Sequence, residues 1–535
     1  MSSPGAAAID GVRWTFTPAG REALRDDDLR LEKHLAAGRA SVVKHGGHRT
    51  VYRIALGDET VYWKVCRLYG PRAWWRDFLR GPKAKLEFDR ARELANRGLA
   101  TVEPLAWGRM GGFWPPASHL VTRALERTVP LDEYLLDHLP RSPADRRRLT
   151  GALAEFIAKL HDAGVTHPDL HPGNLLVREE PSGYQFFLID VHDVQLGPPL
   201  DRAARRANLA LLNRWFQIRA TRSDRLRFWR AYGGANASPE DDRLIESETE
   251  KSILRLWQSR DGRCLRPNRH FQKVSGRGVR GFAVASLTPG LIDPFLSMPD
   301  APFTWSQATI LKDSRSATVC RWSLAAGDSV VYKRFRLTQA SDPVANLFRR
   351  SGAMRSWQAG HAFLDRGLPT PRPRLVFQRR RFGLPTVGYL LCEGVPDNKH
   401  LHEAIMSAGR ADKWEIVETL ARWVRLMHDR GVSHRDLKAA NILVTAAREC
   451  QFIDLVGVRF RQTVPRRIRV RDLARLNASF VSVPEVSRTD RLRFLRVYLL
   501  WSLRGSAGWK DWWNEIAQAT EDKVRRNALR NRPLG

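Results

Sequence analysis

The chain has 535 residues, too many for one compact core, and at about 100 to 200 residues per domain it should hold two to four domains. Hydrophobic residues make up 43% of the chain and aromatic residues 9%, which excludes a disordered protein. The formal net charge of +32 favours a polyanionic partner, and it leaves nucleic acid, an anionic membrane surface and a phosphorylated substrate open. A basic solvated surface alone would also account for it.

The cysteines and the hydrophobic runs predict the compartment. Five cysteines are scattered without a CxxC pair, which argues against a disulfide framework and against a zinc site. The first residues do not read as a signal peptide, and no uncharged apolar run approaches the roughly 18 residues that span a bilayer. We therefore expect a cytoplasmic protein that is not integral to a membrane.

An internal repeat organises the chain. Residues 42–56 align with 310–324, and residues 159–177 align with 426–444. The spacing between the copies barely changes along the chain, which indicates duplicated domains. The predicted parts are a charged, helical N-terminal extension, a first domain, a linker rich in glycine and proline, and a second domain, over residues 1–40, 41–262, 263–303 and 304–535 respectively.

The elements within each copy follow one order. In the first copy the β-rich runs 51–56 and 60–65 predict a hairpin, and a long amphipathic helix with apolar residues at helical spacing from Leu149 to Leu160 follows. A compact polar loop and a pair of apolar strands close the pattern, and the second copy repeats it from the run 318–324 onward. A strand-rich lobe before a helical lobe predicts the α+β class, with two tandem protein-kinase-like bilobal domains.

One segment of the first copy, residues 72–85, alternates aromatic and basic residues as an interfacial helix does. The alternative is an ordinary helix that packs its aromatic residues on the small lobe, and this alternative is slightly favoured. The tryptophans between Trp509 and Trp513 raise the same question.

Each polar loop carries the pattern HxDxxxxN, followed by an apolar strand and by an aspartate that closes a second apolar strand. Phosphoryl transfer needs this pattern, because one carboxylate must orient or deprotonate the acceptor hydroxyl while an amide and a second carboxylate hold magnesium ions. Loop-capping polar residues are the alternative, which two copies with matching upstream lysines disfavour. The residues are His167, Asp169, Asn174 and Asp190 in the first copy and His434, Asp436, Asn441 and Asp454 in the second.

A lysine lies in an alternating apolar strand upstream of each loop, at Lys64 and at Lys333. A lysine at this position would lie over the nucleotide phosphates and would be fixed by a helix glutamate. Glu87 is the natural partner in the first copy. Ser356 occupies the corresponding place in the second copy, so Lys333 is predicted to lack this ion pair.

The turn expected to hold the phosphates departs from the usual glycine-rich loop. Neither copy contains GxGxxG, and Gly46 and Gly47 occupy the turn in the first copy. The predicted nucleotide-binding residues are Lys64, Glu87, Lys333, Gly46, Gly47 and Lys438.

The strings HPDLHPGNLLV and HRDLKAANILV, with their upstream lysines, resemble the protein-kinase-like superfamily and, more narrowly, the lipopolysaccharide core kinases, the Kdo and heptose kinases of the WaaP/InaA type. The resemblance spans most of both copies and implies ATP and Mg²⁺ as cofactors. Neither copy has a true DFG, since Val-His-Asp follows the aspartate in one copy and Leu-Val-Gly in the other. The resemblance implies catalytic roles for Asp169 and Asp436 with His167 and His434, and magnesium ligation by Asn174, Asp190, Asn441 and Asp454.

The same resemblance implies transfer of a phosphate to a sugar hydroxyl of lipid-linked lipopolysaccharide core, at the cytoplasmic face of the inner membrane and with peripheral contact to an anionic membrane. Two alternatives stay open: a protein Ser/Thr kinase, as HRDLKAAN suggests, and a pseudokinase scaffold or regulator of envelope assembly. Nucleic-acid binding ranks below these because charge alone supports it. Glu87 favours the first copy as the active one, and the sequence predicts neither the acceptor sugar nor the oligomeric state.

Overall fold

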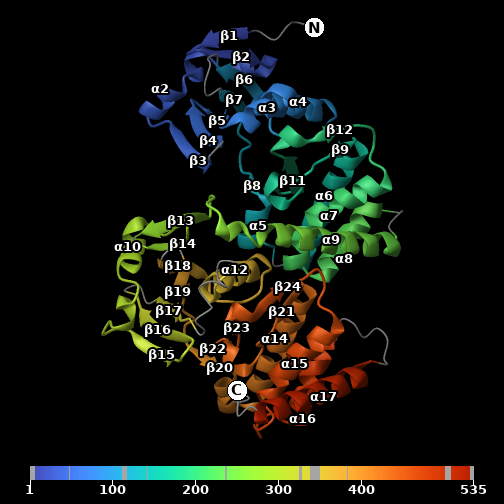
Figure 1. Ribbon diagram of the computed structural model, residues 1–535. Helices are drawn as coiled ribbons and strands as arrows, with labels where there is room; N and C mark the ends of the chain where they lie inside the picture. The colour runs from blue at the N-terminus through green and yellow to red at the C-terminus, as the bar shows by residue number, and fades with distance from the viewer. Residues whose placement is uncertain are drawn as a thin grey trace. The chain divides into compact units, whose positions relative to one another are not determined.

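Figure 1 shows the computed structural model of the chain, which divides into two compact units, Met1–Ile253 and Leu254–Gly535. Each unit contains a seven-stranded antiparallel sheet and a mainly helical part, so the predicted α+β architecture of two tandem bilobal domains is confirmed. The structure describes the chain except residues 1–5, 47–48, 111–116, 141, 235–237, 277, 325–327, 338–349, 382–383, 500–507 and 530–535, and it describes only the backbone of residues 71–73 and 76.

The sheet of the first unit has the strand order β1-β2-β6-β7-β5-β4-β3. Alternation of apolar residues forms these strands, as on β5, where Val61, Trp63 and Val65 are buried. Trp63 donates through Nε1 to His119 Nδ1 at 3.1 Å, and burial lowers the pKa of His119 to about 4, so this ring is neutral in the core. The strands are β1 (Ala6–Ile9), β2 (Val12–Phe16), β3 (Ala40–Gly46), β4 (Arg49–Leu56), β5 (Glu59–Arg67), β6 (Pro104–Met110) and β7 (Ala117–Arg123).

In the first unit α1 to α4 lie beside the sheet, and the helices from α5 onward form the larger lobe (Figure 1). The side chain of Ser142 caps the start of the long helix α6, and the apolar residues predicted to share one face of it, from Leu149 to Leu160, are buried. The helices are α1 (Pro18–Ala23), α2 (Leu31–Ala36), α3 (Pro71–Arg80), α4 (Lys83–Asn96), α5 (Leu131–Asp137), α6 (Pro143–Asp162), α7 (Arg202–Arg219), α8 (Arg222–Gly233) and α9 (Pro239–Arg260), the last of which spans the boundary between the units. Short strands complete the lobe: β8 (Val129–Pro130), β9 (Val165–Thr166), β10 (Leu175–Glu180), β11 (Gly183–Leu188) and β12 (Gln195–Leu196).

The second unit repeats the strand order of the first, as β13-β14-β18-β19-β17-β16-β15. Its sheet consists of β13 (Phe271–Gly276), β14 (Val279–Val284), β15 (Thr309–Asp313), β16 (Ala317–Ser323), β17 (Ser329–Phe335), β18 (Pro373–Arg381) and β19 (Leu384–Glu393). The other elements are α10 (Pro289–Ser297), α12 (Gly352–Asp365), β20 (Asn398–His400), α13 (Leu401–Ser407), α14 (Arg410–Asp429), β21 (Val432–His434), β22 (Ile442–Thr445), β23 (Cys450–Phe452), β24 (Val458–Phe460), α15 (Arg466–Ala478), α16 (Arg488–Leu499) and α17 (Trp509–Ala528). In α17, Trp512 and Trp513 pack against the core of this unit.

A large and a small residue face each other at one position of each sheet, in opposite order. In the first unit Trp14 on β2 lies opposite Gly108 on β6, and a Cβ atom on Gly108 would lie 2.8 Å from the Trp14 ring. In the second unit Gly281 on β14 lies opposite Phe377 on β18. Both aromatic side chains are buried. The large residue therefore lies on β2, nearer the edge of the sheet, in the first unit and on β18, nearer its centre, in the second.

Two segments differ from the sequence-based expectation. Residues 1–40 were expected to be a helical extension, but β1 and β2 lie within them, and β2 pairs with β6. Residues 263–303 were expected to be a linker, but they contain β13 and β14, and β14 pairs with β18. Both hairpins therefore belong to the sheets, because their alternating apolar residues are buried against distant strands.

The remaining expectations concern cysteines and membrane spans. All five cysteines are free. Within the described ranges, no helix combines the length and the apolar character that crossing a bilayer requires.

Candidate active site

The lysine on β5 of the first unit pairs with a glutamate of the adjacent helix. Lys64 Nζ and Glu87 Oε1 form an ion pair, and the Glu87 side chain is only 4% exposed. Glu87 lies on the buried face of α4 together with Phe88 and Ala91, which fixes the carboxylate toward the sheet. The structure thus places Lys64 in contact with Glu87, the partner that the sequence predicted for it.

An arginine that the sequence analysis did not single out joins this pair to the aspartate that closes the second apolar strand. Arg49 at the start of β4 donates through Nη1 to Asp190 Oδ1 at 2.9 Å and through Nη2 to Glu87 Oε2 at 3.4 Å. Burial opposes the charge of Arg49, but the carboxylates of Glu87 and Asp190 outweigh it and raise the pKa of the guanidinium. Ala317 occupies the corresponding position in the second copy. This difference between the repeats is the sequence feature that could have marked Arg49 as a candidate site residue.

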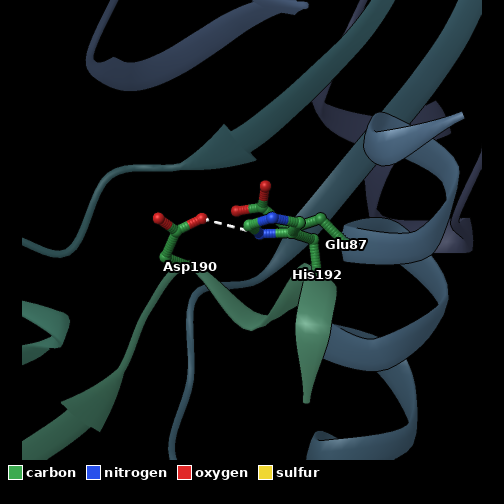
Figure 2. A group of neighbouring side chains, drawn as sticks. All are labelled: Glu87, Asp190 and His192. Carbon is green, nitrogen blue, oxygen red and sulfur yellow. Dashed lines mark hydrogen bonds and ion pairs between the residues drawn. The ribbon is translucent and has the colours of Figure 1, made fainter. Parts of the chain in front are cut away.

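Asp190 lies two residues after the end of strand β11 and adopts a left-handed backbone conformation with φ of 60°, which aspartate tolerates better than most residues. His192 Nδ1 lies 3.0 Å from Asp190 Oδ1, and Figure 2 shows the two side chains facing each other beside Glu87. Burial would raise the pKa of Asp190, but the hydrogen bond with His192 and the charge of Arg49 hold it well below its usual range.

These side chains can hold a metal ion. Glu87, Asp190 and His192 offer ligand atoms that all lie within 4.8 Å of one another. Magnesium prefers oxygen ligands in octahedral geometry, so the carboxylates fit it better than the imidazole does. Asn174 lies next to Asp190 through the backbone, since Ile189 N donates to Asn174 O at 3.0 Å. The donor set therefore suits a magnesium ion, which would compete with Arg49 for Asp190.

The polar loop of the first unit is held by its own side chains. Asp169 N donates to His167 Nδ1 at 3.1 Å, and Asn174 Nδ2 donates to Asp169 O at 2.9 Å. Asn208 on α7 donates to His167 O at 2.7 Å. These bonds fix the backbone and leave the carboxylate of Asp169 81% exposed, where an acceptor can reach it.

The two histidines of the motif differ from its aspartates in their surroundings. His167 and His434 are buried, and each accepts a backbone N–H of the following aspartate. Burial lowers the pKa of both rings, which therefore stay neutral. Sequence reasoning had grouped these histidines with the catalytic residues, but their contacts are those of residues that position the loop.

A histidine lies beside the Asp169 carboxylate. Its Oδ2 lies 3.6 Å from His171 Nε2, and the hydrogen bond with His171 lowers the pKa of Asp169 although burial opposes it. A carboxylate with a lowered pKa is a weak general base. The geometry suits an aspartate that orients a hydroxyl more than one that removes its proton early.

The loop of the second unit is held by the same backbone contacts, but an acid replaces the amide beneath it. Asn441 Nδ2 donates to Asp436 O at 2.9 Å and to Asp436 Oδ2 at 3.1 Å. His434 N donates to Oδ2 of the fully buried Asp472 at 2.8 Å. Asp472 occupies the place of Asn208 in the first unit, at the same spacing after the strand-closing aspartate, and sequence reasoning missed both.

The lysine of the second unit has a different partner. Lys333 Nζ lies 2.9 Å from Asp454 Oδ1, and Ser356, at the place of Glu87, is buried on α12. The ion pair between lysine and glutamate, which the sequence predicted to be missing, is absent between these two positions. Lys333 pairs instead with Asp454, the candidate metal ligand. Asp454 has the same left-handed conformation as Asp190, with φ of 57°.

The remaining predicted nucleotide-binding positions are Gly46, Gly47 and Lys438. Gly46 is the exposed last residue of β3, and Gly47 lies outside the described residues. Lys438 is half-buried and directly precedes the short helical turn of residues 439–441.

The bilobal fold and the paired lysine, aspartate and asparagine positions define a protein-kinase-like class. The model of the lipopolysaccharide kinase (Kdo/WaaP) family matches residues 67–232 and 321–498, which together make up more than half of the chain. The chain belongs to this family, and each unit contains one matched segment.

Several relatives are similar to parts of the chain. The lipopolysaccharide core heptose(I) kinase WaaP of Pseudomonas aeruginosa is 32% identical over 160 residues, which is 28% of this chain and 59% of that protein. The WaaP of Escherichia coli is 25% identical over 240 residues, 42% of this chain and 90% of that protein. The 3-deoxy-D-manno-octulosonic acid kinase of Xylella fastidiosa is 31% identical over 146 residues, 26% of this chain and 56% of that protein. A solved structure of WaaP in complex with acyl carrier protein aligns over 46% of this chain and 99% of that chain, with 24% identity and a TM-score of 0.34.

Proposed function

We propose that the chain is an ATP- and magnesium-dependent phosphotransferase that phosphorylates a sugar hydroxyl of lipopolysaccharide core, and that the first unit carries the activity. The observation that supports this most is the buried Lys64–Glu87 pair beside Asp190, together with the exposed Asp169 carboxylate. The family match and the kinase relatives support the substrate class.

The proposed mechanism assigns one task to each side chain. Bound ATP supplies the phosphoryl group, and Mg²⁺ neutralises the charge that develops on it. Lys64, held by Glu87, would anchor the phosphates, and Asn174 and Asp190 would hold the magnesium ion. Asp169 would orient the acceptor hydroxyl in line with the phosphate, and His167 would keep its backbone in place.

The second unit is proposed to bind or regulate. Lys333 is committed to Asp454, and the position of the glutamate is a serine, so its phosphate anchor and its metal ligand neutralise each other. This contact favours the pseudokinase alternative for this unit alone. The acceptor is proposed to be lipid-linked and reached at the cytoplasmic face of the inner membrane.

The test compares Asp169→Asn with its matched control Asp436→Asn in the full chain. Magnesium-dependent ATP turnover is measured with a Kdo-lipid A or extended-core acceptor. We expect Asp169→Asn to lower turnover by about 10²- to 10⁴-fold and Asp436→Asn to leave it close to wild type.

Three outcomes would contradict this proposal in different ways. Loss of turnover in Asp436→Asn alone would move the activity to the second unit. Labelling of protein instead of the sugar acceptor would support the protein-kinase alternative. A wild-type chain that binds nucleotide without any turnover or labelling would support the scaffold alternative.

A further inference from the structure

Helix α3 exposes a cluster of large apolar side chains on the first unit. Trp74, Trp75, Phe78 and Leu79 are 43%, 57%, 69% and 75% exposed. Trp74 stacks on Phe78 with 5.8 Å between ring centroids, and Trp75 lies edge-on to both rings. The alternative that the sequence slightly favoured, aromatic residues packed on the small lobe, is wrong for Trp74, Trp75 and Phe78, because these rings pack on one another and are exposed.

The other face of α3 is attached to the sheet. The Asp77 side chain is only 9% exposed, and its Oδ2 lies 3.5 Å from Nη2 of Arg109 on β6. Gly81 N donates to Asp77 O at 2.8 Å and closes the helix. The helix is therefore anchored through its polar side, and its aromatic side is presented outward.

Basic side chains border the aromatic cluster. Arg80 ends α3, and Lys83 and Lys85 begin α4, all three exposed. Lys85 is paired with Asp89, at 2.8 Å. Aromatic residues beside basic ones are the composition of a helix that lies in a membrane interface, with the rings among the headgroups and the cations on anionic lipid. The overall charge of +32 favours the same surface.

We propose that α3, with Arg80 and Lys83, docks the first unit on an anionic bilayer. This inference rests on the proposed function in one respect, namely that a lipid-linked acceptor lies at such a surface. Lys83 and Glu87 lie one turn apart on α4, about 6 Å along the helix axis. Docking therefore brings the glutamate that holds the catalytic lysine close to the membrane surface.

The test measures partition of the full chain into vesicles in the absence of nucleotide. Wild type is expected to bind vesicles of phosphatidylglycerol and phosphatidylcholine more tightly than vesicles of phosphatidylcholine alone. Trp75→Ser/Phe78→Ser is expected to lower the partition coefficient at least about tenfold. Arg80→Gln/Lys83→Gln is expected to lower it only on anionic vesicles, by roughly fivefold for each charge removed.

The matched control is Val43→Ser, which removes an exposed apolar side chain from β3 in the same lobe. Its partition should equal that of wild type, and the thermal unfolding midpoint of every variant should be unchanged. Equal binding of wild type and Trp75→Ser/Phe78→Ser would overturn the proposal and leave the cluster to a protein partner. Equal loss in Val43→Ser would overturn it as well.

Turnover separates this inference from the proposed function. With a soluble, lipid-free core acceptor, the α3 variants should turn over ATP as wild type does, whereas with a vesicle-embedded acceptor they should be slower. If wild type shows no turnover at all but its vesicle binding still depends on Trp75 and Phe78, the kinase proposal fails and the docking surface stands. If wild type turns over ATP normally and Trp75→Ser/Phe78→Ser binds vesicles as tightly as wild type does, the docking proposal alone fails.

Discussion

Lys64 and Lys333 occupy the same place in the two units, yet they pair with different acids. In the first unit the lysine lies on Glu87 of the adjacent helix. In the second unit that helix position is Ser356, and the lysine lies on Asp454 instead. The same strand residue is therefore paired with a helix glutamate in one unit, where we propose that it anchors phosphate, and with the candidate metal ligand in the other.

The difference extends to a second position. Arg49 neutralises Asp190 in the first unit, and Ala317 replaces it in the second. The charges therefore balance in both sites. The first has two cations and two carboxylates, and the second has one of each. This balance is expected because a buried charge without a partner is costly. The second unit thus lacks both the glutamate and the arginine, and its lysine is paired with the candidate metal ligand instead.

Removing the lysines should give the largest difference between the units. Lys64→Met is expected to lower kcat/KM for ATP turnover by on the order of 10²-fold or more, because it would remove the proposed anchor of the phosphates. Lys333→Met, the matched control, should leave turnover near wild type. Steady-state kinetics of both variants decide this, and an equal loss in the two would contradict the unequal roles of the units.

The buried residue beneath each loop should give an intermediate effect. Asp472→Asn removes the negative charge from the acceptor of His434 N and adds an N–H donor beside it, and Asn208→Asp replaces the donor to His167 O by a carboxylate. Each change should cost about 1 to 3 kcal/mol of local stability, since it leaves a buried polar group badly matched. Hydrogen exchange should rise in residues 434–441 for the first variant and in residues 167–174 for the second.

Hydrogen exchange in the two loops also tests whether the two units respond independently. Exchange that rises in both loops for either variant would show that the two units do not respond independently. Unchanged exchange in both would show that the charge of Asp472 does not set the stability of its loop.

The smallest expected effect is a gain of function in the second unit. Ser356→Glu, made in a Lys64→Met background, should draw Lys333 away from Asp454 and tighten nucleotide binding a few-fold. Burial opposes ionisation of Asp454, and Lys333 is what holds its pKa below the usual range, so the pKa of Asp454 should rise when the lysine moves. Ser356→Gln has the same length without the charge and should give no tightening in a nucleotide titration, whereas equal tightening would contradict the ion-pair explanation.

The sequence predicted the parts of the fold that local patterns encode. Alternation predicted the strands around Lys64 and Lys333, and helical spacing predicted α6 and α14. The hairpin β1–β2 was missed although Val12, Trp14 and Phe16 alternate, because its partner β6 lies far away in the chain and charged residues surround it. Pairing over such distances is a property of the whole sheet and not of the segment.

The candidate site was predictable to a similar degree. Residues in recognisable strings, such as Asp169 and Asn174, were found from the sequence. Arg49 and Asp472 were not, since each acts through a contact with a distant segment and neither belongs to a recognisable string. The outward direction of α3 depends on which face the sheet covers, and the amphipathic pattern alone could not decide it.

The opposed sizes at Trp14 and Gly108, and at Gly281 and Phe377, would disfavour an exchange of the hairpins β1–β2 and β13–β14 between the two sheets during folding. Repeated domains in one chain are prone to such misassembly, because each sheet offers the other's hairpin a similar edge. A misplaced β2 would set Trp14 against Phe377, and overpacking of that kind costs about 1 to 3 kcal/mol. A misplaced β14 would set Gly281 against Gly108 and leave the space of an indole empty, at about 3 to 5 kcal/mol. One residue on each hairpin, Trp14 on the first and Gly281 on the second, would thus favour pairing of that hairpin with its own sheet.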